Sequence, residues 1–285
     1  MTELHAGKAS RIAIALAPIL LLLAVAGTSE ASSPSSGSVP QPKNLVNSGD
    51  LTACADISLP PMEFYPSSNS TTPSGLDVNL ESAAASLKGL KGKFVETQFP
   101  GLIPALTAHR CDVVWSAILI SGPRTKATPA IPYMTVHDVI MVQGGNPTNI
   151  HTPADLSGKV VAVEAGTSEV TLMDSLNKNF ASEGKAAAQI QTYPDATSAA
   201  EQLLTKRADA YVDLGVTGAY RTQVEPKSFD VVYKFPTKMT FGIYYNQADA
   251  SLGTALTRAL ADMRTNGTFP KLLKKWNIAP SSANL

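Results

Sequence analysis

The chain has 285 residues, with 23 basic and 23 acidic side chains and a formal net charge of zero. Nucleic-acid-binding proteins and polybasic membrane-surface proteins need an excess of Lys and Arg on one face, so nucleic acid is not an expected partner. The hydrophobic content of 44% and the charged content of 16% are typical of a chain that buries a core. We therefore expect one large or two ordinary domains.

The N-terminal segment has the pattern of a secretory signal peptide. Lys8 and Arg11 precede an uncharged run over 12–29, and small residues suited to cleavage end at Ala26 and Ala31. The alternative is an uncleaved membrane anchor, but the apolar centre of the run is shorter than the roughly 20 residues that span a bilayer, and a proline interrupts it. We predict cleavage after Ala26 or Ala31 and export to the periplasm.

A flexible leader is predicted after the signal peptide (1–31). Residues 32–48 are dominated by serine and proline and show no repeating period. The folded part should therefore begin near residue 49. No later stretch of the sequence is long and apolar enough to cross a bilayer.

The predicted export bears on the two cysteines, Cys54 and Cys111. An even pair in an oxidising compartment favours a disulfide over a metal or redox site. Loop-closure entropy gives such a bridge a stabilising effect of about 4 kcal/mol. The alternative is a pair of buried thiols that act as small hydrophobic side chains.

Strand-like and helix-like segments alternate along the first half of the folded part. Apolar residues at three- and four-residue steps predict a helix over 76–87 that stops at Gly89. Short apolar runs predict strands at 51–56, 93–97, 112–120 and 137–145. A short helix is expected at 102–108.

The alternation restarts in the second half. An apolar strand at 159–166 leads into a helix whose capped start is Thr167-Ser168-Glu169. The other expected elements are a helix around 199–204, strands at 208–214, 229–235 and 239–246, and terminal helices at 252–263 and 269–276. This order predicts two α/β lobes with largely parallel sheets. Such sheets bind ligands at the carboxyl ends of their strands.

The sequence carries few catalytic motifs. It has no glycine-rich dinucleotide or phosphate loop after a strand, no nucleophile elbow and no zinc-binding HExxH pattern. The four histidines lack the spacing that would gather a metal ion, so neither a metal nor a cofactor is expected. The pattern favours a binding protein over an enzyme.

Several blocks of the sequence resemble a known family. They read GDLTACADISLPPMEF, GLDVNLESAAASL, FPGLIPALTAHRCDVVWSAILISGPR, DLSGKVVAVEAGTSEV, KRADAYVD and ALADMRTNGTFPKLLKKW. In order and spacing they are similar to the polar amino-acid-type periplasmic substrate-binding proteins of ABC importers, extracellular solute-binding protein family 3. The resemblance extends from about residue 49 to residue 278.

The resemblance implies a type II periplasmic binding protein fold, in which two hinge strands join two α/β lobes. Lobe 1 would contain residues 49–141 and 243–285, and lobe 2 residues 142–242. The implied function is to capture an amino acid or a related small carboxylate between the lobes and deliver it to the permease subunits. The protein is expected to be a monomer. Cys54 and Cys111 also occur as a pair on neighbouring strands in a subgroup of the family.

The resemblance also assigns ligand-binding residues. Arg124 matches the arginine that clamps the ligand's α-carboxylate, and a planar guanidinium suits this role because it donates two parallel hydrogen bonds. Phe99 matches an aromatic residue that packs on the ligand side chain, and Asp56 matches a polar position that faces it. Gly166 and Thr167 match a helix start that offers N–H groups and a hydroxyl to the same carboxylate.

The chain departs from the family pattern at several of these positions. Leu59 stands in place of a second aromatic residue, Ala117 in place of a common glycine, and Leu119 in place of a threonine or serine. Leu214 occupies the position of an aspartate that binds the ligand's ammonium, and Asp213 comes one residue early. A shift of one residue on a strand turns a side chain to the other face unless a bulge corrects it.

These departures suggest a hypothesis about the ligand. Burying an unpaired ammonium is costly, so the protein would keep the carboxylate clamp and relax or abandon ammonium recognition. The ligand would then be a small carboxylate, a modified amino acid, or an amino acid held differently with Asp213 recruited.

The alternative function is that of a secreted dehydratase acting on a prephenate- or arogenate-like acid, because the same fold hosts such enzymes. A dehydratase would need a general acid in the cleft, and Asp213 or Glu169 could serve.

Overall fold

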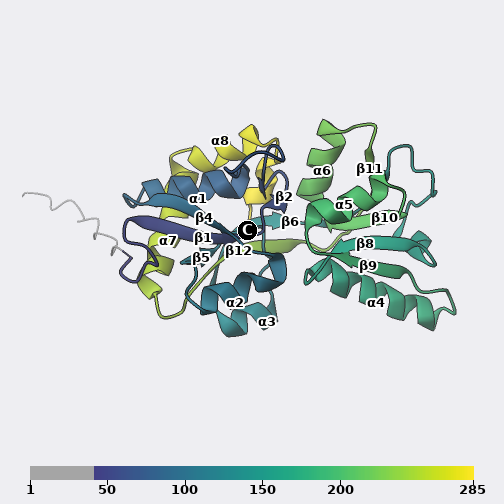
Figure 1. Cartoon of the computed structure of the whole chain (residues 1–285), viewed down its shortest axis with the longest axis horizontal. Coiled ribbons are helices and arrows are strands. Elements are labelled where there is room, and N and C mark those ends of the chain that lie inside the picture. The colour runs from purple at the N-terminus through teal and green to yellow at the C-terminus, as the bar shows by residue number, and fades with distance from the viewer. Residues whose placement is uncertain (1–41) are drawn as a thin grey trace, which may run out of the picture. The chain divides into compact units, whose positions relative to one another are not determined.

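The computed structural model describes residues 42–285, which form two five-stranded sheets with helices on both faces of each (Figure 1). The predicted signal peptide and most of the predicted leader lie outside the described residues. Within residues 42–285, no helix has the length and apolar character needed to cross a membrane. The predicted α/β architecture of two lobes is confirmed.

The first lobe is built on a sheet of strand order β4-β1-β5-β12-β6. Its strands are β1 (Asp50–Ala55), β4 (Lys91–Glu96), β5 (Val113–Val114), β6 (Ala130–Val136) and β12 (Met239–Tyr245). The strand β1 pairs in parallel with β4 and β5, whereas β12 pairs antiparallel with β5 and β6. This places the carboxyl ends of β1, β4 and β5 at one edge of the sheet.

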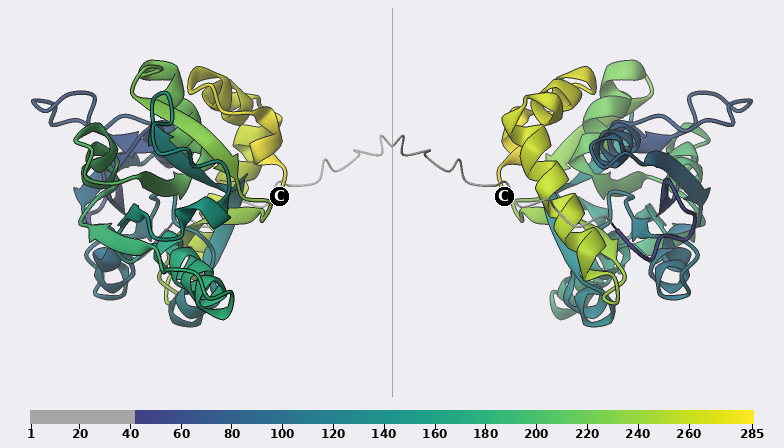
Figure 2. Two further views of the ribbon diagram at one scale, coloured as in Figure 1. Left: turned by 90° about the vertical axis from the view of Figure 1, so that its right-hand side faces the viewer. Right: turned by 90° about the vertical axis from the view of Figure 1, so that its left-hand side faces the viewer.

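Helices cover both faces of the first sheet. One face carries α1 (Leu76–Ser86), α7 (Ala250–Thr265) and α8 (Thr268–Lys275), whose apolar side chains share one core with the sheet. The other face carries α2 (Leu102–Thr107) and α3 (Gly122–Ala127) (Figure 1). In the right-hand view of Figure 2, α7 and α8 lie in front of this lobe, on its outer side.

The second lobe has a sheet of strand order β11-β7-β10-β8-β9. Its strands are β7 (Asp138–Gln143), β8 (Val160–Glu164), β9 (Gln189–Tyr193), β10 (Ala210–Leu214) and β11 (Phe229–Lys234). The strand β8 runs parallel to β9 and β10, and β7 runs antiparallel to β10 and β11. One face carries α4 (Ser168–Ser182), and the other carries α5 (Ala196–Leu204) and α6 (Gly215–Val224) (Figure 1).

The chain crosses between the sheets twice. It leaves the first sheet at His137, between β6 and β7, and returns through residues 235–238, between β11 and β12. The Nδ1 atom of His137 lies 3.2 Å from the carbonyl oxygen of Phe235, so the two crossings are neighbours. Sheet pairing thus assigns residues 138–141 to the second lobe and 239–242 to the first, a few residues earlier than the expected boundaries. The expectation placed the crossings inside β7 and β12, which are ladder strands.

One strand is much shorter than predicted, and several elements were missed. The apolar run at 112–120 contains only β5, because the chain leaves the ladder at Trp115, and the backbone of Ala117 is left-handed with φ 41°. The strand β6 contains a proline, which an edge strand tolerates, and β9 is mostly polar and half exposed. The helix α6 has two glycines, which are poor helix formers. A short hairpin of β2 (Ser58–Leu59) and β3 (Glu63–Phe64) was also missed.

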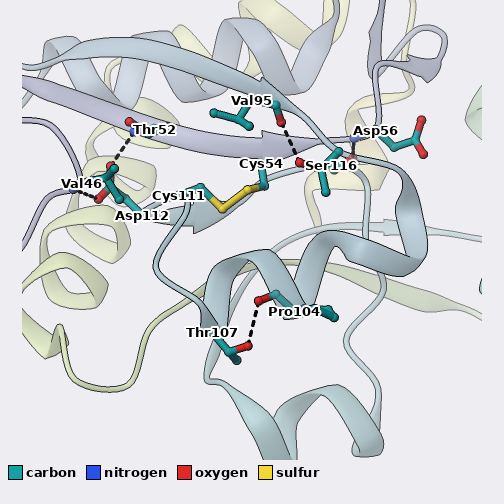
Figure 3. The surroundings of a disulfide bond; sticks show 11 residues. Val46, Thr52, Cys54, Asp56, Val95, Pro104, Thr107, Cys111, Asp112 and Ser116 are labelled. Atoms are coloured by element: carbon teal, nitrogen blue, oxygen red, sulfur yellow. Dashed lines mark hydrogen bonds between the residues drawn. A yellow bond between two sulfur atoms is a disulfide. The ribbon is translucent and has the colours of Figure 1, made fainter.

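The predicted disulfide is confirmed. Cys54 on β1 is bonded to Cys111, which comes just before β5, with 5.7 Å between the two Cα atoms (Figure 3). Asp112 reinforces this junction, because its carboxylate accepts hydrogen bonds of 2.7 Å from the backbone N–H groups of Val46 and Thr52. The last part of the predicted leader therefore contacts the first lobe.

Candidate ligand-binding cleft

A cavity lies between the carboxyl ends of strands from both lobes. The first lobe contributes Asp56, Ser58, Leu59, Glu63, Phe99, Ser116, Ala117, Leu119 and Arg124. The second lobe contributes Glu164, Thr167, Ser168, Glu169, Asp213 and Leu214. The cavity leaves about 20 Å³ for the centres of water-sized molecules, so a ligand larger than water needs the lobes to separate.

The fold explains why these residues meet. Asp56 follows β1 directly, Phe99 follows β4, and Ser116 follows β5. In the second lobe, Glu164 ends β8 and Asp213 lies near the end of β10. Because parallel strands end at the same edge of a sheet, each lobe presents its polar strand ends to the cleft. Every expected ligand-binding residue lines the cavity except Gly166, whose carbonyl oxygen instead accepts a hydrogen bond from Arg124.

Arg124 projects from α3 and contacts both lobes. Its Nη1 donates a hydrogen bond of 3.1 Å to the carbonyl oxygen of Leu119, and its Nη2 donates one of 3.4 Å to that of Gly166. The guanidinium carbon lies 5.2 Å from the centre of the Phe99 ring, a cation–π contact. Burial lowers the pKa of Arg124. The group is thus held in place at the cavity wall, where it can bind a carboxylate in two-point fashion.

Thr167 precedes α4 but does not cap it through its side chain. The hydroxyl donates a 2.8 Å hydrogen bond back to the carbonyl oxygen of Glu164. The prediction of a helix start was correct, but the predicted side-chain cap was wrong, because the hydroxyl is engaged with the strand end. The Thr167 side chain therefore leaves the first N–H groups of α4 uncapped, and this helix start lies at the cavity wall.

A pair of carboxyl groups joins the two lobes across the cavity. Asp56 is 6% exposed and accepts a 2.7 Å hydrogen bond from the N–H of Phe99. Its carboxyl lies beside that of Glu164, and the two can share a hydrogen bond only if one of them holds a proton. Burial raises the pKa of Asp56, and burial together with the charge of Asp56 raises the pKa of Glu164 to about 10.

The second lobe adds a further carboxyl cluster. Asp213 accepts a 2.6 Å hydrogen bond from the Tyr211 hydroxyl, and burial with the nearby charge of Glu169 raises its pKa to about 7. Burial and that same charge of Glu169 raise the pKa of Asp138 to about 8. Asp213 and Leu214 both line the cavity. The strand β10 ends at Leu214, and beyond that point side chains no longer alternate between the two faces of the sheet. The one-residue shift does not turn Asp213 away.

In the first lobe a buried carboxyl shapes the cavity floor. Asp77 is fully buried and accepts 2.7 Å hydrogen bonds from the N–H of Ala117 and the hydroxyl of Tyr133. This contact holds Ala117 in its left-handed conformation, which explains why a glycine would suit the position. Glu63 accepts a 2.9 Å hydrogen bond from Ser116, and burial followed by the charge of Asp77 raises the pKa of Glu63.

Carboxyl groups dominate the wall of the cavity. Five of them line it, namely Asp56, Glu63, Glu164, Glu169 and Asp213, beside the guanidinium of Arg124. Sequence reasoning did not place Glu63 and Glu164 at the cavity. Glu164 offered a signal, since it ends an otherwise apolar strand at the edge where ligands bind. Within residues 42–285 no three His, Cys, Asp or Glu side chains are grouped so that they could hold a metal ion.

Comparison with known proteins identifies the family. The sequence model of the family "Bacterial extracellular solute-binding proteins, family 3" matches residues 51–279. The chain belongs to this family. Among its relatives, the L-cystine-binding protein TcyJ of Escherichia coli is 25% identical over 263 residues, which cover 92% of this chain and 94% of that protein.

Solved structures of similar fold support the same assignment. An ancestral arginine-binding protein bound to arginine aligns with a TM-score of 0.72 and 27% identity, covering 80% of this chain and 98% of its own. The ancestral amino acid-binding protein AncCDT-1, a precursor of cyclohexadienyl dehydratase, aligns with a TM-score of 0.71 and 29% identity, covering 80% and 95%. The candidate site of this chain lies between its two α/β lobes.

Proposed function

We propose that the protein is the substrate-binding component of an ABC importer, which captures an amino acid between its lobes in the periplasm and delivers it to the permease. The observation that carries the proposal is the position of Arg124, held against both lobes at the wall of a cavity rich in carboxyl groups. A guanidinium and carboxylates together complement the carboxylate and ammonium of an amino acid. The relatives, which include a cystine-binding and an arginine-binding protein, agree with this class.

The acidic wall revises the ligand hypothesis. Several carboxyls at the cleft have raised pKa values because they are buried and lie near one another, and the pKa of Asp213 reaches about 7 although the charge of Arg221 lowers it. An ammonium among them would favour their charged forms. Of the three ligand classes considered above, an amino acid held differently, with Asp213 recruited, fits this wall best. A ligand with a second positive charge fits it as well.

Binding is proposed to close the lobes about the two crossings. A ligand that contacts Arg124 from one side and Glu164 or Asp213 from the other stabilises the arrangement in which these groups meet. The small volume of the cavity agrees with this mechanism, since a ligand enters only after the crossings at His137 and 235–238 have bent. The permease would then recognise the closed form.

Calorimetry with the mature protein tests the proposal. L-arginine, L-histidine, L-cystine and L-glutamate are titrated, with succinate as a carboxylate that lacks an ammonium. At least one amino acid should bind, and Arg124→Gln should weaken it 100-fold or more. The control is Arg258→Gln, since Arg258 forms an exposed ion pair with Asp262 on α7, and it should bind normally. Unchanged affinity in Arg124→Gln would refute the clamp.

One observation favours a second function, that of a dehydratase. Asp213 lines the cavity with a pKa of about 7, which suits a general acid near neutral pH, and one structural neighbour is described as a precursor of cyclohexadienyl dehydratase. An absorbance assay with prephenate and arogenate decides the matter. Turnover that disappears in Asp213→Asn would make the protein an enzyme, whereas tight binding of amino acids without turnover supports the transport role.

A further inference from the structure

A second cavity adjoins the cleft and contains a buried arginine. It leaves about 470 Å³ for the centres of water-sized molecules, compared with about 20 Å³ in the first cavity. Asp56 and Ser58 line both cavities. Its remaining wall comes from the segments 57–68 and 96–98 in the first lobe and from Asp195, Thr197 and Arg221 in the second. The two cavities are therefore neighbouring parts of the space between the lobes.

Arg221 is buried, and two of its three side-chain nitrogens lack a hydrogen-bond acceptor among the described residues. It lies on α6, is 8% exposed, and its guanidinium carbon is 5.4 Å from the centre of the Phe229 ring. No group in residues 42–285 accepts a hydrogen bond from its Nε or Nη2 atoms. The two salt bridges found in this part of the chain are Lys185–Glu183 and Arg258–Asp262, so the charge of Arg221 is not neutralised by a direct ion pair. A buried charge of this kind is costly unless an anionic group binds it.

Carboxylates lie in the same cavity as Arg221. Glu96 accepts a 3.1 Å hydrogen bond from the Tyr65 hydroxyl, and Asp195 accepts hydrogen bonds from Ser198 at the start of α5. Together with Asp56 they can accept hydrogen bonds from an ammonium. The second cavity thus repeats the chemistry of the first, with one guanidinium and several carboxylates.

We propose that the space between the lobes binds a ligand with two α-amino acid ends joined by a short flexible chain. One α-carboxylate binds Arg124, and the other binds Arg221. Each ammonium faces the carboxylates of its own cavity. The inference rests on the proposed function, since Arg124 serves as the first clamp in both.

The test compares two-ended and one-ended ligands by calorimetry. L-cystathionine has two amino acid ends and a thioether that leaves the protein's disulfide intact, and L-cystine is a second two-ended probe. S-methyl-L-cysteine has one end. The native protein should bind the two-ended ligands at least 10-fold more tightly. Arg221→Gln should abolish that advantage and leave the affinity for S-methyl-L-cysteine within 2-fold, whereas Arg124→Gln should weaken all three.

Several outcomes would overturn the inference. These are equal binding of one-ended and two-ended ligands by the native protein, or unchanged two-ended affinity in Arg221→Gln. A melting curve verifies that Arg221→Gln folds. Arg221→Met is the second variant, because it fills the same space without a buried charge. Arg124-dependent binding of S-methyl-L-cysteine without a two-ended advantage would refute this inference alone, and failure of every amino acid to bind would refute the proposed function.

Discussion

The carboxyl of Asp56 in the first lobe lies beside the carboxyl of Glu164 in the second, so an acid pair spans the cleft. The two groups can share a hydrogen bond only while one of them holds a proton. The pKa of Glu164, about 10, keeps that proton in place at neutral pH. Closure of the lobes and protonation of the cleft are therefore linked.

The first prediction concerns this pair. Above about pH 10 both carboxylates are charged and repel each other, so the ligand-free protein should open and its radius of gyration should increase. Glu164→Gln should abolish the increase, because its amide donates to Asp56 at every pH. Small-angle X-ray scattering at pH 7 and pH 10.5 measures the change. The control is Glu183→Gln, since Glu183 forms an exposed ion pair with Lys185. The same expansion in Glu164→Gln would contradict the prediction.

The second prediction concerns stability without ligand. Burial raises the pKa values of Asp77 and Asp213 to about 7 and that of Asp138 to about 8, from 3.8. Because the pKa values of these carboxyls are higher in the folded than in the unfolded protein, their protonated forms stabilise the fold. Their contribution to the free energy of unfolding is fully present below about pH 4 and is lost as the pH rises through 7 and 8. The melting temperature should fall by several degrees between pH 5 and pH 9.

Scanning calorimetry over this pH range checks the second prediction. Asp213→Asn should melt with a shallower pH dependence, because one of the titrating groups is gone. The exposed carboxylate of Asp155, whose pKa is lowered by N–H donors from His151 and Thr152, titrates below this window and does not interfere. A melting temperature that rises from pH 5 to pH 9 would show that the sign is wrong.

The third prediction concerns proton release. A ligand ammonium that binds near Asp213 favours its charged form, so the carboxyl with a pKa of about 7 loses a proton on binding. The affinity should increase between pH 6 and pH 8. Calorimetry at pH 7 in phosphate and in Tris gives the number of protons exchanged from the difference in binding enthalpy. Release should be reduced in Asp213→Asn, and proton uptake would argue against a cationic group at this site.

Sequence patterns predicted the elements whose packing leaves a periodic trace. The apolar stripes of α1 and α7 and the buried strands β1, β7 and β8 were found for this reason. The run at 112–120 is predicted as one strand because it is apolar, yet the chain leaves the ladder at Trp115 and the rest of the run is buried outside it, with Ala117 left-handed. A buried loop and a paired strand both give a continuous apolar run in the sequence, so only the structure distinguishes them.

The site was predictable where a motif fixes a residue's place. Arg124 and Phe99 came from the family resemblance, and the structure brings both to the cavity. Glu63, Glu164 and Arg221 were not found, because their meaning depends on what surrounds them. A carboxyl or guanidinium in a sequence is ordinarily solvated, and burial without a partner becomes visible only in three dimensions.

The last prediction concerns closure. Gly166 has a φ of +78°, and a Cβ at this position would lie 3.0 Å from Cγ of Pro100 on the opposite lobe. Gly184 has a similar φ of +68°, with no atom within 4 Å of a Cβ placed there. Replacing either glycine with alanine costs about 1 kcal/mol in backbone conformation, so both variants should lose a similar amount of stability. Only Gly166→Ala should hinder the approach of the lobes and weaken ligand binding, by about 10-fold. Calorimetric titration of both variants with the same amino acid makes the comparison, and an equal loss of affinity in Gly184→Ala would mean that closure does not bring Gly166 against Pro100.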